Sequence, residues 1–234
     1  MAARPLENWF RSIPPITKVY ASSCFLTTLA VHLDLIKPLS LYLNFNSVFY
    51  QYEIWRLVTT FLWFGPFGLN FLFHMYFLIR HSSALEEGSF SGRASDYLYM
   101  LLFGAVMLLI LDFICHTTGI SRIMFLAPSL SFMVVYVWSR RNPHAVMALF
   151  GLFQFSAPYL PWVLLVIGLL LEQSPVYDIL GILVGHIYFF CEDVYPKFRP
   201  NRRILKTPAV LDTLVGQNAP GRGHPEDENR PHQD

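Results

Sequence analysis

The chain has 234 residues, of which 54% are hydrophobic and only 14% are charged, with a formal net charge of +1. Soluble domains carry roughly a quarter charged residues, so this chain has too few polar side chains to cover a globule in water. The long apolar stretches and a mean hydropathy of +0.41 predict an integral membrane protein, and the near-neutral charge argues against a nucleic-acid binder.

Six apolar runs follow one another along the chain, and each predicts one membrane-spanning helix. They comprise residues 19–33, 57–79, 97–114, 123–138, 145–171 and 176–191. The first run could instead be a cleaved signal peptide, but no small-x-small cleavage site follows it, so we expect an uncleaved span. The predicted fold class is therefore an all-α membrane protein, a helical bundle of six spans.

The distribution of lysine and arginine predicts the orientation of this bundle. If the N-terminus lies in the cytosol, fourteen of them fall on that side, and three, Lys37, Arg56 and Arg122, fall on the far side. The positive-inside rule then puts both termini in the cytosol. We expect a cytosolic or interfacial segment at 1–18, a membrane domain at 19–195 and a cytosolic tail at 196–234, largely disordered because it is so polar.

Two of the predicted spans are short. The fourth and sixth runs have about sixteen apolar residues each, or roughly 24 Å of helix, whereas the hydrocarbon layer is about 30 Å thick. Such spans either continue into the flanking polar sequence or thin the bilayer around them. The alternative is that the true helices are longer than the apolar runs.

Polar side chains inside apolar runs are candidates for function, because a polar group in lipid is costly. The candidates are His74, Asp112, Gln154 and His186. His186 directly follows Gly181-x-x-x-Gly185, a spacing that lets another helix approach one face closely. For both histidines the alternative role is one hydrogen bond to a neighbouring helix.

The segment between the first two runs, residues 34–56, is rich in aromatic residues and is expected to lie in the far interface as a hairpin or helix. It ends in Trp55-Arg56, an indole beside a guanidinium that suits a phosphate or backbone anchor. The three cysteines lie in or beside apolar stretches without metal-ligand spacing, so they predict packing and no metal or cofactor.

Taken together, these features resemble the rhomboid superfamily and, within it, the Derlins. The strings that carry the resemblance lie at residues 55–59, 64–66, 85–90, 136–141, 158–162 and 185–190. The resemblance implies a six-span rhomboid-like pseudoprotease of the endoplasmic reticulum membrane. It also implies a part in exporting misfolded proteins to the cytosol for ubiquitination and degradation, for which we expect local membrane thinning and a lateral client cleft.

A rhomboid protease needs a Gly-x-Ser-Gly nucleophile at the start of the fourth span and a histidine base in the sixth. Ala127 stands at the aligned position, and of the second-span His-x-x-x-Asn pair His74 is kept while Leu78 replaces the asparagine. We therefore expect no enzyme activity. The alternative is an intramembrane serine protease that uses Ser129 or Ser131 with His186.

A transporter or channel is a third hypothesis. The lack of inverted-repeat symmetry and the scarcity of charge in the spans argue against it.

The partners that the resemblance implies are misfolded clients, a membrane ubiquitin-ligase complex, a cytosolic AAA ATPase, other Derlins in a homo- or hetero-oligomer, and the lipid bilayer. Some Derlins bind the ATPase through a Gly-rich tail motif with apolar residues near both ends. The tail of this chain has only Gly221-Arg222-Gly223, so it does not predict direct binding.

Overall fold

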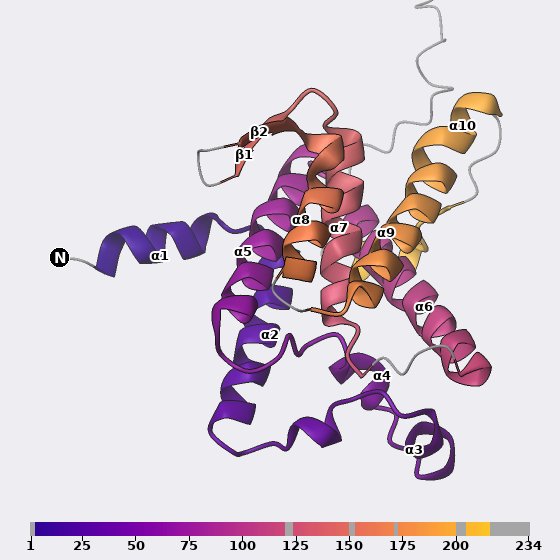
Figure 1. The fold of residues 1–234 in the computed structure, drawn as a ribbon. Coiled ribbons are helices and arrows are strands. Elements are labelled where there is room, and N and C mark those ends of the chain that lie inside the picture. The colour runs from indigo at the N-terminus through magenta and orange to yellow at the C-terminus, as the bar shows by residue number, and fades with distance from the viewer. Residues whose placement is uncertain (1–2, 120–123, 150–152, 171–172, 200–204, 216–234) are drawn as a thin grey trace, which may run out of the picture.

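The computed structural model describes residues 3–119, 124–149, 153–170, 173–199 and 205–215, and these residues are mostly helical (Figure 1). The α-helices are α1 (Ala3–Ser12), α2 (Pro15–His32), α3 (Phe45–Tyr50), α4 (Arg56–Thr59), α5 (Leu69–Ala84), α6 (Ala94–Thr118), α7 (Ala127–Arg141), α8 (Leu160–Leu170), α9 (Pro175–Phe189), α10 (Tyr195–Phe198) and α11 (Ala209–Leu214). The 3-10 helices are η1 (Pro38–Ser40) and η3 (Ala157–Tyr159), and the π-helices are η2 (Leu85–Ser89) and η4 (Phe190–Val194).

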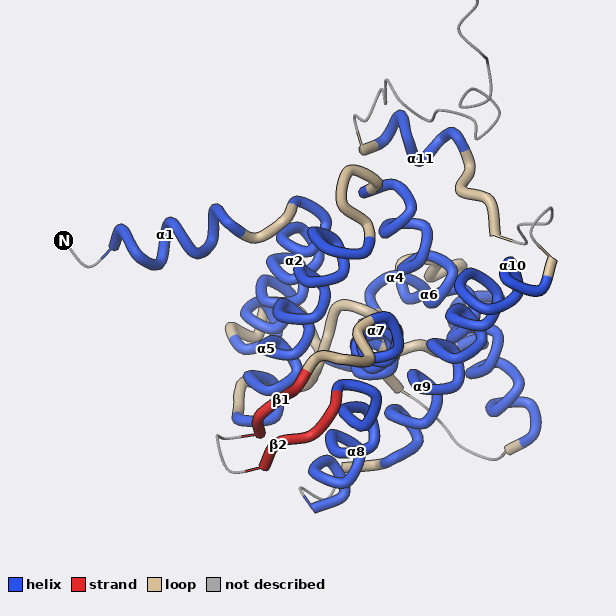
Figure 2. Tube along the Cα trace, turned by 90° about the horizontal axis from the view of Figure 1, so that it is seen from above, coloured by secondary structure: helices blue, strands red, loops and turns tan. Residues whose placement is uncertain are grey.

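Helix α7 is the centre of the bundle. It contacts α5, α6, α8 and α9 (Figure 2), and most of its side chains are buried. Its sequence allows this position because small and apolar residues occupy every face, as expected of a helix surrounded by protein. The packing of the four neighbouring helices is therefore set by the surface of α7.

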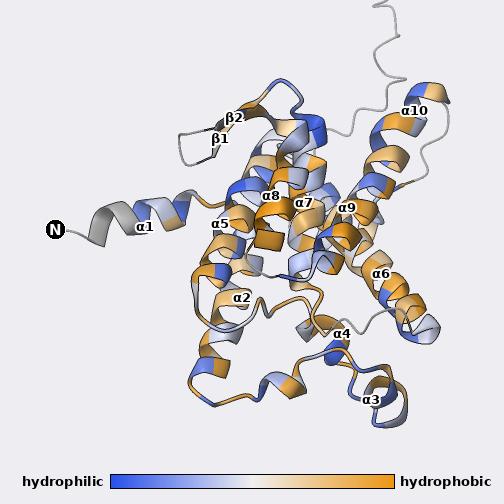
Figure 3. Cartoon of the chain, viewed as in Figure 1, coloured by the Kyte–Doolittle hydropathy of each residue, from blue (hydrophilic) through white to orange (hydrophobic). Residues whose placement is uncertain are grey.

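Among the described residues, two helices are long and apolar enough to cross a membrane, α6 and the continuous segment Pro175–Phe198. Hydrophobic residues also dominate α8 (Figure 3), but Ala157–Leu170 is shorter. The runs at 97–114 and 176–191 are thus confirmed as helical. The sixth run is not short, however, because its helix continues through η4 and α10. The count of six spans remains a prediction.

The predicted second span, 57–79, is wrong in its first half. Helix α4 ends at Thr59 and α5 begins only at Leu69. Between them, Gly65 has a φ of 104°, a left-handed conformation that favours glycine, and the next residue, Pro66, has no amide hydrogen to donate to a helix. Hydropathy alone did not reveal this break.

The predicted fifth span, 145–171, also begins too early, and here a short strand pair departs from the all-α expectation, which the mostly helical structure otherwise meets. Strands β1 (Val146–Leu149) and β2 (Phe153–Ser156) form an antiparallel pair, with Met147 opposite Phe155. Gln154 therefore lies in a strand and not in a span. Pro158 and Pro161 fall in the first turns of η3 and α8, where a missing amide hydrogen costs no intrahelical bond.

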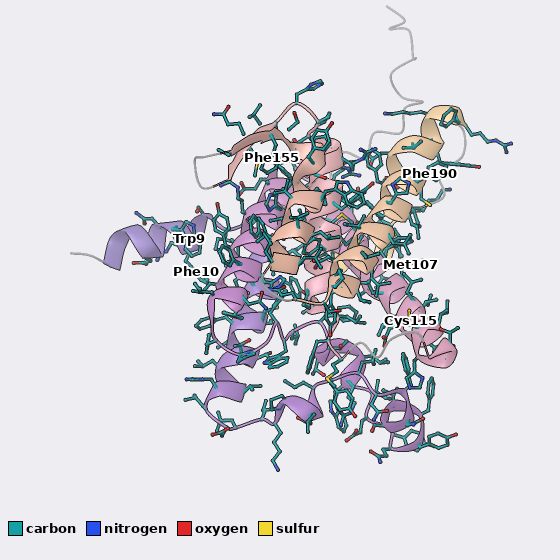
Figure 4. All side chains as sticks on the ribbon, viewed as in Figure 1. Trp9, Phe10, Met107, Cys115, Phe155 and Phe190 are labelled. Carbon is teal, nitrogen blue, oxygen red and sulfur yellow. The ribbon has the colours of Figure 1, made fainter. Side chains whose placement is uncertain are left out.

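The N-terminal helix α1 lies apart from this bundle (Figure 1), whereas the C-terminal helix α11 packs against it. Helix α1 projects sideways from it, with Trp9 and Phe10 exposed (Figures 1 and 4). Helix α11, which falls in the predicted tail, packs on α6: Leu211 is buried, and the hydroxyl of Thr207 donates to Asp96 over 2.5 Å. The tail beyond Val215 lies outside the described residues, and the division into three domains remains a prediction.

A buried carboxylate joins α2 to the turn after α5. Glu86, which is 5% exposed, accepts the backbone amides of Ile16 at 3.0 Å and Thr17 at 2.8 Å, and the Thr17 hydroxyl at 2.7 Å. These amides open α2 and have no partner within the helix. A negative charge is favourable there because the helix dipole is positive at that end.

We predict that Glu86→Ala lowers the free energy of unfolding by about 2–4 kcal/mol, since it leaves two buried amides without an acceptor. Thermal unfolding of the purified protein in detergent measures the effect. The exposed neighbour Glu87 supplies the control, because Glu87→Ala should change stability little. Equal stability of the two variants would contradict this role.

Candidate functional site

The glycine face of α9 lies directly against α7. A methyl group at Gly181 would stand 2.5 Å from the Cβ of Phe132 and closer still to the carbonyl oxygen of Ser129. At Gly185 it would stand 2.9 Å from the Tyr136 ring. Carbon atoms pack at about 3.5–4.0 Å, so only glycine allows the two helices to come this close.

His186 extends the same seam. Its Nδ1 and the hydroxyl of Tyr136 share a hydrogen bond of 2.7 Å, and the two rings meet edge to face with centroids 6.0 Å apart. The residue is otherwise exposed. His186 thus makes one hydrogen bond to a neighbouring helix, which was one of the two roles expected for it.

The serines of the alternative hypothesis lie deeper in α7. Ser129 and Ser131 are both buried, and the Ser129 hydroxyl has no hydrogen-bond partner among the described residues. Tyr136, the partner of His186, follows them by seven and five residues, which is roughly 10 and 7.5 Å of helix rise. The hydroxyl that reaches His186 is therefore that of a tyrosine.

A cleft opens on another side of α7, between α5 and α8. We define the lateral cleft as two adjoining cavities of about 60 and 200 Å³. Its inner part is apolar, and its outer end lies where α5 and α9 begin. Four polar side chains line both cavities, Asn70, His74, Gln173 and Asp178, and the second cavity is also lined by Ser174 and Tyr177.

His74 forms part of the cleft wall. Its ring stacks on that of Phe64, with centroids 5.4 Å apart. Beside it, the side-chain amide of Gln173 donates to Asn70 and so joins the segment before α9 to α5. Leu78, which stands where a protease would carry asparagine, is fully buried one turn further along α5.

Arg56 anchors backbone, one of the two roles expected for it. The residue is 8% exposed, and its guanidinium donates to the carbonyls of Leu39 at 2.8 Å and Tyr42 at 3.0 Å, and to the Glu53 carboxylate at 2.6 Å. It therefore holds the aromatic segment in its folded shape. Its neighbour Trp55 points outward and is 54% exposed.

The predicted site residues thus lie in three places. Trp55 and Arg56 belong to the aromatic segment, and His74 to the lateral cleft. Gly181, Gly185 and His186 lie at the seam between α7 and α9. Among the described residues no group of His, Cys, Asp or Glu could hold a metal ion.

Sequence reasoning missed the other polar residues of the cleft. Asp178 is an acid inside the last apolar run, so the same rule that selected Asp112 should have selected it. Asp112 itself is buried in α6 and lines neither cavity of the cleft. Asn70 lies in the first turn of α5 and Gln173 in the segment before α9, and only the fold brings them together.

Comparison with known proteins gives a consistent result. The model of the Der1-like family matches residues 13–209. A probable derlin-2 homolog of Dictyostelium discoideum is 52% identical over 220 residues, covering 93% of this chain and 86% of that protein. Derlin-2.1 of Zea mays is 48% identical over 223 residues, covering 92% of this chain and 88% of that protein. Derlin-2.2 of Arabidopsis thaliana is 46% identical over 230 residues, covering 96% of this chain and 94% of that protein.

We predict that Gly181→Ala destabilises the protein by about 1–3 kcal/mol, because the added methyl group overpacks the seam between α7 and α9. Thermal unfolding in detergent measures the loss. Gly88 provides a matched control, since a methyl group there would meet no atom within 4 Å. A Gly181→Ala variant as stable as Gly88→Ala would show that the helices can separate at no cost.

Proposed function

The chain belongs to the Der1-like family, and from this membership we propose that it is a non-enzymatic component of endoplasmic-reticulum-associated degradation. In this role it helps misfolded lumenal and membrane proteins to reach the cytosol. We further propose that six helices, α2 and α5 to α9, span the endoplasmic reticulum membrane with both termini in the cytosol. The lysine and arginine distribution supports this orientation.

The lateral cleft is the observation that carries the proposal. It lies between α5 and α8, and it combines apolar walls with a polar outer end. Each unpaired backbone amide of a polypeptide in lipid costs several kcal/mol of free energy. A cleft that offers amide, imidazole and carboxylate groups at membrane depth lowers this cost, so clients would enter the protein here.

Short helices beside the cleft support local membrane thinning. Helix α8 has 11 residues, about 17 Å of helix, and remains well below the roughly 30 Å of a hydrocarbon layer even with η3 in front of it. Lipid next to α8 must then compress or tilt to avoid exposing polar ends. We therefore assign the thinning to the cleft side of the bundle.

The contacts of His186 support a protein without hydrolytic activity. A serine nucleophile needs a base within hydrogen-bond reach, but the ring nitrogen of His186 that faces α7 is paired with Tyr136. The alternative function, an intramembrane serine protease, would require Ser129 or Ser131 to leave its buried position. We propose the misfolded clients, a ubiquitin ligase, an AAA ATPase acting in trans and further Derlin copies as partners.

We predict that closing the lateral cleft abolishes client export. In a background without the native cysteines, Asn70→Cys and Gln173→Cys are joined by a short bis-maleimide, because the native side chains already meet across the mouth. Export is followed with a reconstituted, fluorescently labelled client. It should fall to the level of empty vesicles after cross-linking.

The control joins α6 to α11 by the same reagent, using Leu102→Cys and Val210→Cys, which line a separate apolar cavity. This cross-link should leave export intact. If the cleft can be closed without any loss of export, clients take another route and the proposed function of the cleft is wrong.

We also predict that a serine-directed fluorophosphonate does not label the protein in membranes, because neither Ser129 nor Ser131 is paired with His186. Labelling is read by in-gel fluorescence beside heat-denatured protein. The protease hypothesis requires the opposite outcome, a label that disappears in Ser129→Ala or Ser131→Ala and in His186→Ala.

A further inference from the structure

Asp178 is an unusual residue for the inside of a bundle. It lies in the first turn of α9, is 4% exposed, and lines both cavities of the lateral cleft. None of the described residues donates a hydrogen bond to its carboxylate or pairs with it as an ion. A buried carboxylate without a partner is costly, so one expects a function for it.

The neighbours of Asp178 offer its carboxyl group no opposite charge. Across the cleft, Gly168 of α8 comes so close that a methyl group on it would lie 3.1 Å from Oδ2 of Asp178. The same methyl group would lie 4.0 Å from Oε1 of Gln173. The other polar groups at this end are the amides of Asn70 and Gln173, the imidazole of His74, the hydroxyls of Ser174 and Tyr177, and the indole of Trp63. No lysine or arginine occurs among the described residues that line the cleft.

The remaining lining is apolar and comes from both walls. Phe73 and Phe77 of α5 face Leu164 and Ile167 of α8 across the floor formed by α7. An apolar chain segment would find hydrophobic contact along this slot and the carboxyl group of Asp178 at its outer end. Asp178 follows the first residue of α9 by three positions, or about 4.5 Å of helix, so the carboxyl group lies within one turn of that end.

We propose that Asp178 recognises a basic residue in an apolar membrane segment of the client, positioned about one turn inside the far membrane edge. The inference rests on the proposed function, because the segment enters through the lateral cleft. A lone cation is costly in lipid, and so is the unpaired carboxylate in the cleft. Pairing relieves both costs, which selects segments that carry lysine or arginine over purely apolar ones.

A purely structural role for Asp178 predicts something different. A carboxylate in the first turn of a helix interacts favourably with the positive end of the helix dipole. That interaction would contribute to stability in the absence of clients and would give no preference among them. Client selectivity is therefore the readout that separates the two roles.

The test uses the full chain in phosphatidylcholine vesicles and two labelled alanine-leucine peptides of about 20 residues, long enough to span. One carries lysine one turn from the far end, and the other carries leucine at that position. Binding is measured by energy transfer to the labelled protein. The lysine peptide should bind about tenfold more tightly, as expected for a partly buried charge pair.

Asp178→Asn should remove this preference without weakening the binding of the leucine peptide. Asp178→Glu should keep part of the preference. Asp112→Asn is the matched control, because that acid is similarly buried but does not line the cleft, and it should keep the preference. A preference that survives in Asp178→Asn, or its absence in the unmodified protein, overturns the inference.

The two peptides also separate this inference from the proposed function. If the leucine peptide binds, and the cross-link between Asn70→Cys and Gln173→Cys blocks its entry, the cleft admits segments regardless of charge. Only the role of Asp178 is then at stake. If neither peptide binds, the cleft does not admit membrane segments, and both the inference and the proposed route fail.

Discussion

The close contact between α7 and α9 is the constraint on which the rest of the bundle depends. Glycines 181 and 185 remove the side chains that would hold the two backbones apart, and van der Waals packing at this distance is what associates helices in a medium that offers no hydrophobic driving force. Because α9 and α6 occupy one side of α7 (Figure 2), only the other side is left for α5 and α8. The lateral cleft is the space that those two helices do not fill.

Charged groups fix the ends of this arrangement and leave its middle apolar. Arg56 holds the aromatic segment at one end through two carbonyl groups. At the other end Glu86 caps α2, and Arg141 at the end of α7 pairs with Asp193 after α9, with 3.0 Å between Nη2 and Oδ2. Each of these charges has its partners within the protein, as burial requires. Asp178 differs from them because its position opens onto the cleft.

Hydropathy predicted the helices that face lipid, such as α6, because their apolar runs are continuous. It failed at 57–79 and 145–171, where the chain is equally apolar but leaves the helix. Local signals for both breaks were present, in Gly65-Pro66 and in Pro158, and they carry more information about helix ends than the run length does. The bond between Tyr136 and His186 could not be predicted in this way, since it joins residues 50 positions apart and depends on how α9 seats against α7.

The helices on the two sides of α7 also differ in length, so we expect the lipid on the two sides to be strained to different degrees. Helix α6 has 25 residues, about 37 Å of helix, and can match a full hydrocarbon layer of about 30 Å by tilting. Helix α8 on the cleft side is less than half as long. In the proposed function, lipid is most strained beside the cleft, and an apolar segment that replaced it there would relieve the mismatch. Mismatch and polar lining would thus favour client entry at the same place, whereas the α6 side would offer a client segment neither.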